Sequence, residues 1–508
     1  MNDSAVALSA NTVLAANTVP SVKAVADGPG PGRKAIPGVR RTGQYIPTPP
    51  PRRTLPLARR RRPAYIPLAP AQERMWHAAR SGKSSDWNVA KAVRLSGPEL
   101  RPEALAAAID DVVARHEPLR TRYPATALGP AQVVLPASEA RVRPALVTVD
   151  EAELPHRIAE LAASEFDLAV DLPLRAGLFV LGPQDIVLVL VVHHISLDGR
   201  SIAPLLRDLV MAYSARQAGA EPTWTPLPVD YVDYTLWKHA QLGDYSDEWS
   251  RATQQLCYWA NTLAGRTAVL EFPYTRARPA GARSAAGEMA PVAFDPGVHR
   301  ALLDRADAAQ ASLFMVLQAA FAVAVGAFSG SADVTVATTV AGRDHHLLDD
   351  LVGNFANDVL MRVRLDRAGD VDELLEQVRR VALAAFAHPD TPDQRLKRCL
   401  PEDTAGPLFQ ATLILQRGAT GRPAEADPEA GLTITEIDTG VIRAKHDLEF
   451  GLLEHYDEAG APVGIDGALI YPTDRFERHT AVAFVELFTS IVQLFAGGYH
   501  GPLTGLRL

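Results

Sequence analysis

Two adjacent histidines, an aspartate and a glycine stand close together in the segment His193-His194-Ile195-Ser196-Leu197-Asp198-Gly199. Histidine is the side chain whose ordinary pKa best suits proton transfer near neutral pH. Glycine suits a position that needs unusual backbone angles or the close approach of another group. The HHxxxDG spacing therefore indicates a site for proton transfer.

The segment follows an apolar run, Ile-Val-Leu-Val-Leu-Val-Val at positions 186–192, in which β-branched residues dominate. Such a run predicts a fully buried β-strand. The end of a buried strand can fix the direction of a side chain tightly. A lone His-His pair there is typical of packed core histidines, but the full spacing favours a functional site.

Composition fits an ordinary globular protein of one or two domains. The chain has 508 residues, of which 47% are hydrophobic and 22% charged, and both values are common. Its two cysteines, Cys257 and Cys399, suggest neither a disulfide framework nor a metal site. We find no 20-residue apolar run and no basic secretory leader, so we expect a cytoplasmic protein with no membrane attachment.

Charge is unevenly distributed along the chain. Residues 1–62 contain 11 Lys and Arg against 2 Asp and Glu, a net charge of +9, and the remainder carries −17. The first segment is also rich in Pro and Gly without apolar periodicity, so we expect a disordered basic arm over 1–62. The acidic remainder argues against nucleic-acid binding by the folded part.

Helical and strand patterns alternate through the rest of the chain, which predicts a mixed α/β fold. Amphipathic or apolar periodicity predicts helices at 102–115, 202–215, 312–328 and 476–495. β-branched runs predict strands at 334–340, 412–415 and 432–435. We place one lobe at 63–240, a crossover at 241–279 and a second lobe at 280–508.

Six further segments resemble, in order and spacing, the motifs of condensation domains of nonribosomal peptide synthetases, within the chloramphenicol acetyltransferase-like superfamily. They cover most of the chain from residue 64 onward. The matching segments are Pro67–Trp76, Arg115–Tyr123, Phe166–Arg175, Tyr231–Trp237, Gly342–Asn357 and Pro407–Gln410.

This resemblance implies two acetyltransferase-like lobes in a V, with HHxxxDG at their junction and a tunnel crossing the molecule. The expected reaction transfers a carrier-bound acyl or aminoacyl thioester to an amine acceptor. The substrates are expected to be attached to the phosphopantetheine of carrier proteins. The enzyme itself is expected to hold no cofactor and no metal. With no adenylation, carrier or thioesterase segment in the sequence, we expect a free-standing enzyme served by carriers in trans, with a small-molecule acceptor.

The resemblance also implies roles for individual residues. His194 is the expected catalytic group, either as a general base or by orienting the nucleophile, and His193 is expected to shape the loop. Asp198 is expected in a salt bridge with Arg120 or Arg115, and Gly199 is expected to line the tunnel. We place Ser196, Arg200 and Asn357 along the substrate channel.

Several departures and alternatives remain at this stage. Arg200, Pro389 and Asp358 stand where Trp, Gln and Thr are usual in the family, which bears on specificity. Ester formation with an alcohol, acyl transfer from free or coenzyme A-linked substrates, and a non-catalytic docking platform stay open. The second histidine pair, in the segment 345–350, has its acids one position early and no closing glycine, so we expect a polar loop there.

Overall fold

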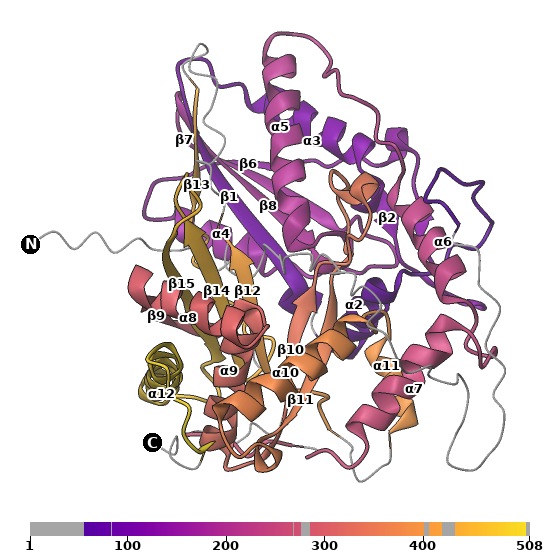
Figure 1. Cartoon of the computed structure of the whole chain (residues 1–508). Coiled ribbons are helices and arrows are strands. Elements are labelled where there is room, and N and C mark those ends of the chain that lie inside the picture. Colours follow the sequence, from indigo (N-terminus) through magenta and orange to yellow (C-terminus); the bar gives the residue numbers. More distant parts are fainter. Residues whose placement is uncertain are drawn as a thin grey trace, which may run out of the picture.

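Two β-sheets, each with its own helices, make up the protein. The computed structural model describes residues 55–503 apart from 83, 268, 276–284, 401–405 and 419–431. In Figure 1 the N-terminal sheet lies above the C-terminal sheet, and the site segment lies where the two approach each other. The V shape of the family remains a prediction for this chain.

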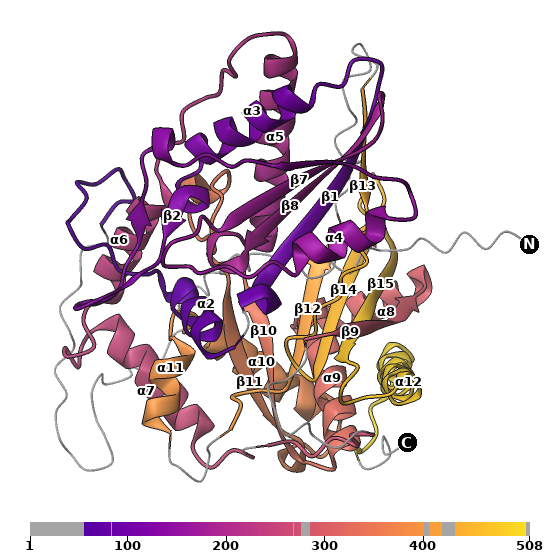
Figure 2. The same cartoon turned by 180° about the vertical axis from the view of Figure 1, so that it is seen from behind.

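The N-terminal sheet has five strands in the order β13-β1-β8-β7-β6. Their bounds are β1 Asn88–Ser96, β6 Ala145–Thr148, β7 Leu174–Gly182, β8 Asp185–His193 and β13 Thr433–Ile437. Helices α3 (Pro102–Arg115) and α5 (Ile202–Gln217) cover one face, and α4 (Leu154–Ala162) covers the other, as the two opposite views show (Figures 1 and 2). Alternate β8 residues enter the two cores, so this strand is buried on both faces as its β-branched run predicts.

The C-terminal sheet has six strands in the order β11-β10-β12-β14-β15-β9. Their bounds are β9 Gly287–Phe294, β10 Asp333–Val340, β11 Asn357–Arg364, β12 Ala411–Arg417, β14 Leu448–Tyr456 and β15 Pro462–Pro472. Its core also contains residues of the helices α8 Pro296–Ala308, α9 Leu313–Ser329, α10 Val371–Phe386 and α12 Arg478–Ala496. By length and composition α12, and the bent pair α8–α9, could cross a bilayer, but both contribute buried side chains to this core.

Smaller elements surround the junction of the sheets. Helices α2 Pro70–Ser81, α6 Tyr231–Leu242, α7 Arg251–Leu263 and α11 Asp393–Cys399 lie there, with the two-residue strands β2 Thr121–Arg122, β3 Ala125–Thr126, β4 Gly129–Pro130 and β5 Val133–Val134. All the predicted helices are present, and each of their ends lies within two residues of its predicted position. These are the helices at 102–115, 202–215, 312–328 and 476–495. The predicted strands at 334–340 and 412–415 are present too, as parts of β10 and β12.

The chain divides between the sheets less simply than the sequence indicates. The strand predicted at 432–435 exists as β13, but it pairs antiparallel with β1, from Ala92 opposite Ile437 to Ser96 opposite Thr433. The C-terminal part of the chain therefore completes the N-terminal sheet, and the predicted second lobe at 280–508 is wrong for this segment. Propensity identifies a strand but not its distant partner.

The predicted boundary of the basic arm is also wrong at its C-terminal end. Residues 55–62 pack on α6, where Leu57 is buried and Trp237 donates to the Leu55 carbonyl at 2.7 Å. Arg59 binds Asp230 at 3.0 Å, and Arg62 binds Glu117 at 2.7 Å. These arginines therefore form ion pairs with carboxylates of the same chain. Residues 1–54 of the predicted arm lie outside the described residues.

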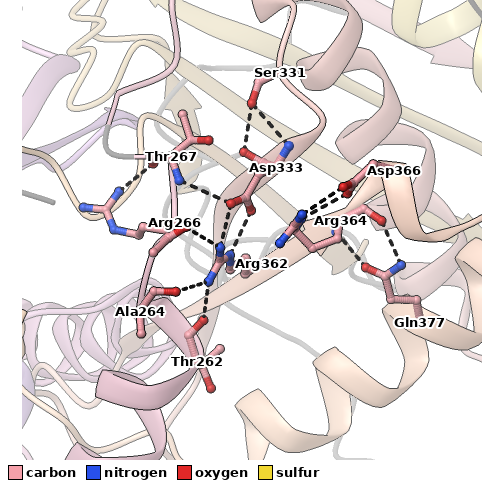
Figure 3. Close-up of polar contacts among 11 residues, drawn as sticks. Thr262, Ala264, Arg266, Thr267, Ser331, Asp333, Arg362, Arg364, Asp366 and Gln377 are labelled. Carbon is pink, nitrogen blue, oxygen red and sulfur yellow. Dashed lines mark hydrogen bonds and ion pairs between the residues drawn. The ribbon is translucent and has the colours of Figure 1, made fainter. Parts of the chain in front are cut away.

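One arginine ties the crossover to the C-terminal sheet (Figure 3). Arg362, on β11, donates to both carboxylate oxygens of Asp333 at 2.8 and 2.7 Å. It also donates to the carbonyls of Thr262, Ala264 and Gly265 at 2.8–2.9 Å. These carbonyls end α7, where backbone acceptors lack helical partners, so one side chain fixes both the end of the helix and the Asp333 carboxylate.

Replacing Arg362 with Met should lower the free energy of unfolding by about 3 kcal/mol, because Asp333 would keep its charge without its partner. Urea unfolding followed by circular dichroism measures this. Arg364→Met is the matched control, since its pair with Asp366 is 31% and 46% exposed and should contribute less than about 1 kcal/mol. Equal losses in the two variants would contradict the assignment.

Candidate active site

The HHxxxDG segment begins where β8 ends, at His193, and continues as two short 3₁₀ turns. His193 is fully buried, and its Nδ1 accepts a hydrogen bond from the Ile195 backbone N–H at 3.1 Å. Its ring meets the ring of Phe166 edge to face at 6.1 Å between centroids. Burial lowers the pKa of His193 to about 3. The geometry therefore supports the loop-shaping role expected of this residue.

His194 faces the other way and lines two cavities between the sheets. The Nδ1 atom of the ring is enclosed by protein, and a hydrogen bond to the residue's own backbone favours the protonated ring. Burial lowers the pKa of His194 well below 6.5, and the nearby Lys445 and Arg74 lower it further. A neutral imidazole of this kind can accept a proton at neutral pH.

A buried network of hydrogen bonds stabilises the HHxxxDG loop. Gln72, on α2, donates to the Ile195 carbonyl at 3.2 Å and to the Tyr123 hydroxyl at 3.3 Å. That hydroxyl lies 2.7 Å from Ser196 Oγ. Ser196 is fully buried in this network and lines none of the cavities described below. Its predicted place in the substrate channel is therefore wrong, and its hydroxyl helps to hold the loop.

Asp198 forms the expected salt bridge, but with a different arginine. Arg343 Nη2 lies 3.0 Å from Asp198 Oδ1, and the two side chains are 0% and 1% exposed. The same carboxylate accepts from the backbone N–H groups of Ser201 at 2.9 Å and Phe355 at 3.0 Å. Arg343 and Phe355 come from the segment between β10 and β11, so this carboxylate joins the two halves of the chain.

The predicted partners of Asp198, Arg120 and Arg115, are wrong. Arg115 binds Asp208 at 2.6 Å. Arg120 donates to the Leu135 carbonyl and lies 3.6 Å from Glu117. Both arginines are thus engaged with groups of the N-terminal half, and the Asp198 carboxylate points away toward the other half.

Close backbone packing brings the other family motifs to this ion pair. Gly342 has φ +63°, and a Cβ there would lie 2.0 Å from the Phe355 carbonyl oxygen. A Cβ on Gly353 would lie 2.2 Å from the ring of Tyr231. Glycine is therefore required at both positions. The Tyr231 hydroxyl donates to the Asn354 carbonyl, so α6, the segment 342–357 and the histidine loop form one packed unit.

Three cavities meet at Lys445, and His194 lines two of them. The β1 cavity, of about 40 Å³, is bounded by Asn88, Ala90, His194, Gly199, Arg443 and Lys445, among others. The central cavity, of about 50 Å³, is bounded by Arg74, Trp87, His194, Asp358, Lys445 and Glu449, among others. The α11 cavity, of about 900 Å³, is bounded by Arg74, Trp87, Lys397, Phe409, Lys445 and Arg475, among others. Shared residues place the three cavities in series, and Gly199 lines the β1 cavity.

The two narrow cavities hold only one or two water molecules each, by volume. An ion pair crosses the series at its narrow part, where Arg74 of α2 binds Asp358 of β11. Thr339 also donates to Asp358, at 2.8 Å. A substrate that reaches His194 through the central cavity therefore passes charged groups from both halves of the chain.

Two more predicted channel residues lie outside these cavities. Asn357 precedes Asp358 on β11, and side chains alternate between the faces of a strand, so only Asp358 lines the central cavity. Arg200 lines none of the three cavities. Channel positions for Asn357 and Arg200 therefore stay predictions.

The second histidine pair lies away from the cavities. His345 and His346 stack on each other at 4.6 Å between ring centroids. The segment expected to be a polar loop contains a short 3₁₀ turn at His346–Leu348. Within the described ranges, no group of three or more His, Cys, Asp or Glu side chains is placed to hold a metal ion.

His194 should stay neutral as the pH falls from 7.5 to 5.5, because its pKa lies below 6.5. ¹⁵N NMR of histidine-labelled protein can follow the ring, with the signal assigned by comparison with His194→Gln. The signals of the other histidines in the same spectra serve as internal references. The free energy of unfolding should fall below about pH 6.5, where the unfolded chain binds protons that the folded histidines do not. A His194 midpoint at or above 6.5 would contradict this assignment.

Solved structures share this fold. The X-domain from teicoplanin biosynthesis is 31% identical, with a TM-score of 0.80 over 89% of this chain and 100% of that one. The same X-domain in complex with OxyB gives a TM-score of 0.81. SgcC5 from Streptomyces globisporus is 25% identical, with a TM-score of 0.63 over 86% of this chain and 100% of that one.

Curated relatives are much longer proteins. The isonitrile lipopeptide synthase of Mycobacterium tuberculosis is 40% identical over 86% of this chain, and the dimodular nonribosomal peptide synthase of Bacillus subtilis is 39% identical over 86%. This chain spans only 17% and 18% of their lengths. The family model named Condensation domain matches residues 64–507. On this match, with HHxxxDG placed at the cavities between the sheets, the chain belongs to the condensation-domain family.

Proposed function

We propose that this protein is a condensation enzyme that transfers a carrier-bound acyl or aminoacyl thioester to an amine and forms an amide. The observation that carries the proposal is the His194 ring, which lines two cavities between the two halves of the chain and whose pKa is lowered well below 6.5 by burial. Relatives named as nonribosomal peptide synthases support the same reaction class.

In this reaction the amine nitrogen attacks the thioester carbonyl carbon, and the carbonyl electron pair moves to oxygen. His194 Nε2 accepts the proton that the nitrogen loses, or holds the amine in line for attack. The tetrahedral intermediate then expels the pantetheine thiolate, which recovers the proton. The chain's own contribution is to orient one neutral imidazole and to exclude bulk water around it.

We propose carrier proteins as the partners, because their phosphopantetheine arms are long and thin enough for a narrow channel. The series of cavities offers two directions of approach, from the β1 cavity and from the α11 cavity. Phosphopantetheine is thus a part of the substrates. A cytoplasmic location, where such carriers are loaded, belongs to the same proposal, as do carriers that act as separate proteins.

Two other functions remain candidates. An alcohol acceptor would give an ester through the same proton transfer. A docking platform is favoured by one specific observation, the TM-score of 0.81 with an X-domain that was crystallised in complex with OxyB. An intact His194 facing the cavities gives the enzymatic function the stronger support.

Intact-mass spectrometry of carrier proteins tests the proposal. Acyl-loaded carriers are offered with matched amine and alcohol acceptors, free and carrier-bound. Wild type should form the amide, and His194→Ala should lower the rate about 10²–10⁴-fold, the usual contribution of a general base.

His346→Ala is the matched control, because that histidine is exposed and outside the cavities, and it should keep the wild-type rate. Ester as the sole product would favour the alcohol acceptor. A folded wild type that transfers nothing from any carrier pair would contradict the proposal and favour the platform.

A further inference from the structure

Lys445 occupies the point where the three cavities meet. It lines the β1, central and α11 cavities, whereas His194 lines only the first two. Its ammonium lies 5.4 Å from the centre of the Trp87 ring, an attractive arrangement for a cation. Any group that reaches His194 through the central cavity therefore passes this lysine.

The backbone around Lys445 is held firmly in place. The Glu449 carboxylate, 3% exposed, accepts from the backbone N–H groups of Lys445 and His446. The preceding residue, Ala444, donates its N–H to the Ala285 carbonyl at 2.9 Å. A side chain on so constrained a backbone can present its charge at a fixed position, as electrostatic catalysis requires.

Two cations act on the His194 ring. Lys445 and Arg74 each act on it in the sense that opposes its protonation. On the acidic side, Asp358 is bound to Arg74, and Glu449 lies beside Lys445. Burial lowers the pKa of Lys445, and Glu449 opposes that lowering. A cation in this enclosed place acts on nearby charge far more strongly than it would in water.

We propose that Lys445 is a catalytic residue whose ammonium binds the carbonyl oxygen of the thioester as negative charge develops on it. This rests on the proposed function, since it concerns the same transfer. When the amine attacks, the C–N bond forms and the oxygen becomes an oxyanion beside the Lys445 ammonium. When the C–S bond breaks, the electron pair returns to the carbonyl, and Lys445 keeps its own protons throughout.

Lys445→Met should lower kcat about 10²–10³-fold, the usual effect of removing one donor to an oxyanion. Lys445→Arg should recover a substantial part of the rate, because it restores the positive charge. Lys445→Gln keeps a hydrogen-bond donor without charge and serves if the Met variant does not fold. Lys91→Met is the matched control, since Lys91 binds Glu436 at 2.6 Å and lines none of the three cavities.

The His194 titration gives a second readout that needs no substrate. Removing the cation in Lys445→Met should raise the midpoint of the His194 ring in ¹⁵N NMR, whereas Lys91→Met should leave it unchanged. A purely structural role for Lys445 would not move this midpoint or allow rescue by arginine.

The outcomes separate the two proposals. A lower kcat with a raised His194 midpoint and rescue by arginine supports the assignment of Lys445. Wild-type rates in folded Lys445→Met, or an unchanged midpoint, would overturn it and leave the condensation function standing. A wild type without transfer would overturn both, even if the midpoint moved.

Discussion

The ion pair between Asp198 and Arg343 is the interaction on which the site depends. Both side chains are removed from water, and the carboxylate also accepts two backbone N–H groups. Each charge is therefore tolerated only while the other is in place, since a lone buried charge is strongly unfavourable. Because one partner follows His194 and the other comes from the opposite half, the pair couples the histidine loop to the association of the two sheets.

This coupling gives the site its chemical character. The loop aims His194 at the cavities, while Gln72 and Tyr123 hold its rear side. Burial, together with the nearby Lys445 and Arg74, lowers the pKa of the His194 ring. In the proposed reaction the same cations would also favour negative charge on the reacting oxygen.

The sequence predicted the secondary structure that local residue patterns determine. The buried strand at 186–192, the helix at 102–115 and the place of His194 at a strand end follow from periodicity and β-branched content. The partner of Asp198 could not be found in this way, because Arg343 lies 145 residues away and nearer arginines fit the pattern equally well. A lone lysine such as Lys445 carries no local signal at all.

Other features of the site have signals in the sequence. Asn357 and Asp358 fall on opposite faces of β11, and strand alternation applied to the segment separates them. Gly342-Arg343 stands in one of the family motifs and follows a strand, which indicates a position near the site. The membership of β13 in the N-terminal sheet has no such signal, because strand pairing at long range depends on the whole fold.

A double-mutant cycle across the ion pair tests the central claim most directly. Asp198→Asn, Arg343→Met and the double variant are compared with wild type by urea unfolding and by the rate of acyl transfer. The ion pair predicts strong non-additivity in both measurements, with a coupling energy above about 1.5 kcal/mol in stability. Effects that add within about 0.5 kcal/mol would show independent sites and contradict the account.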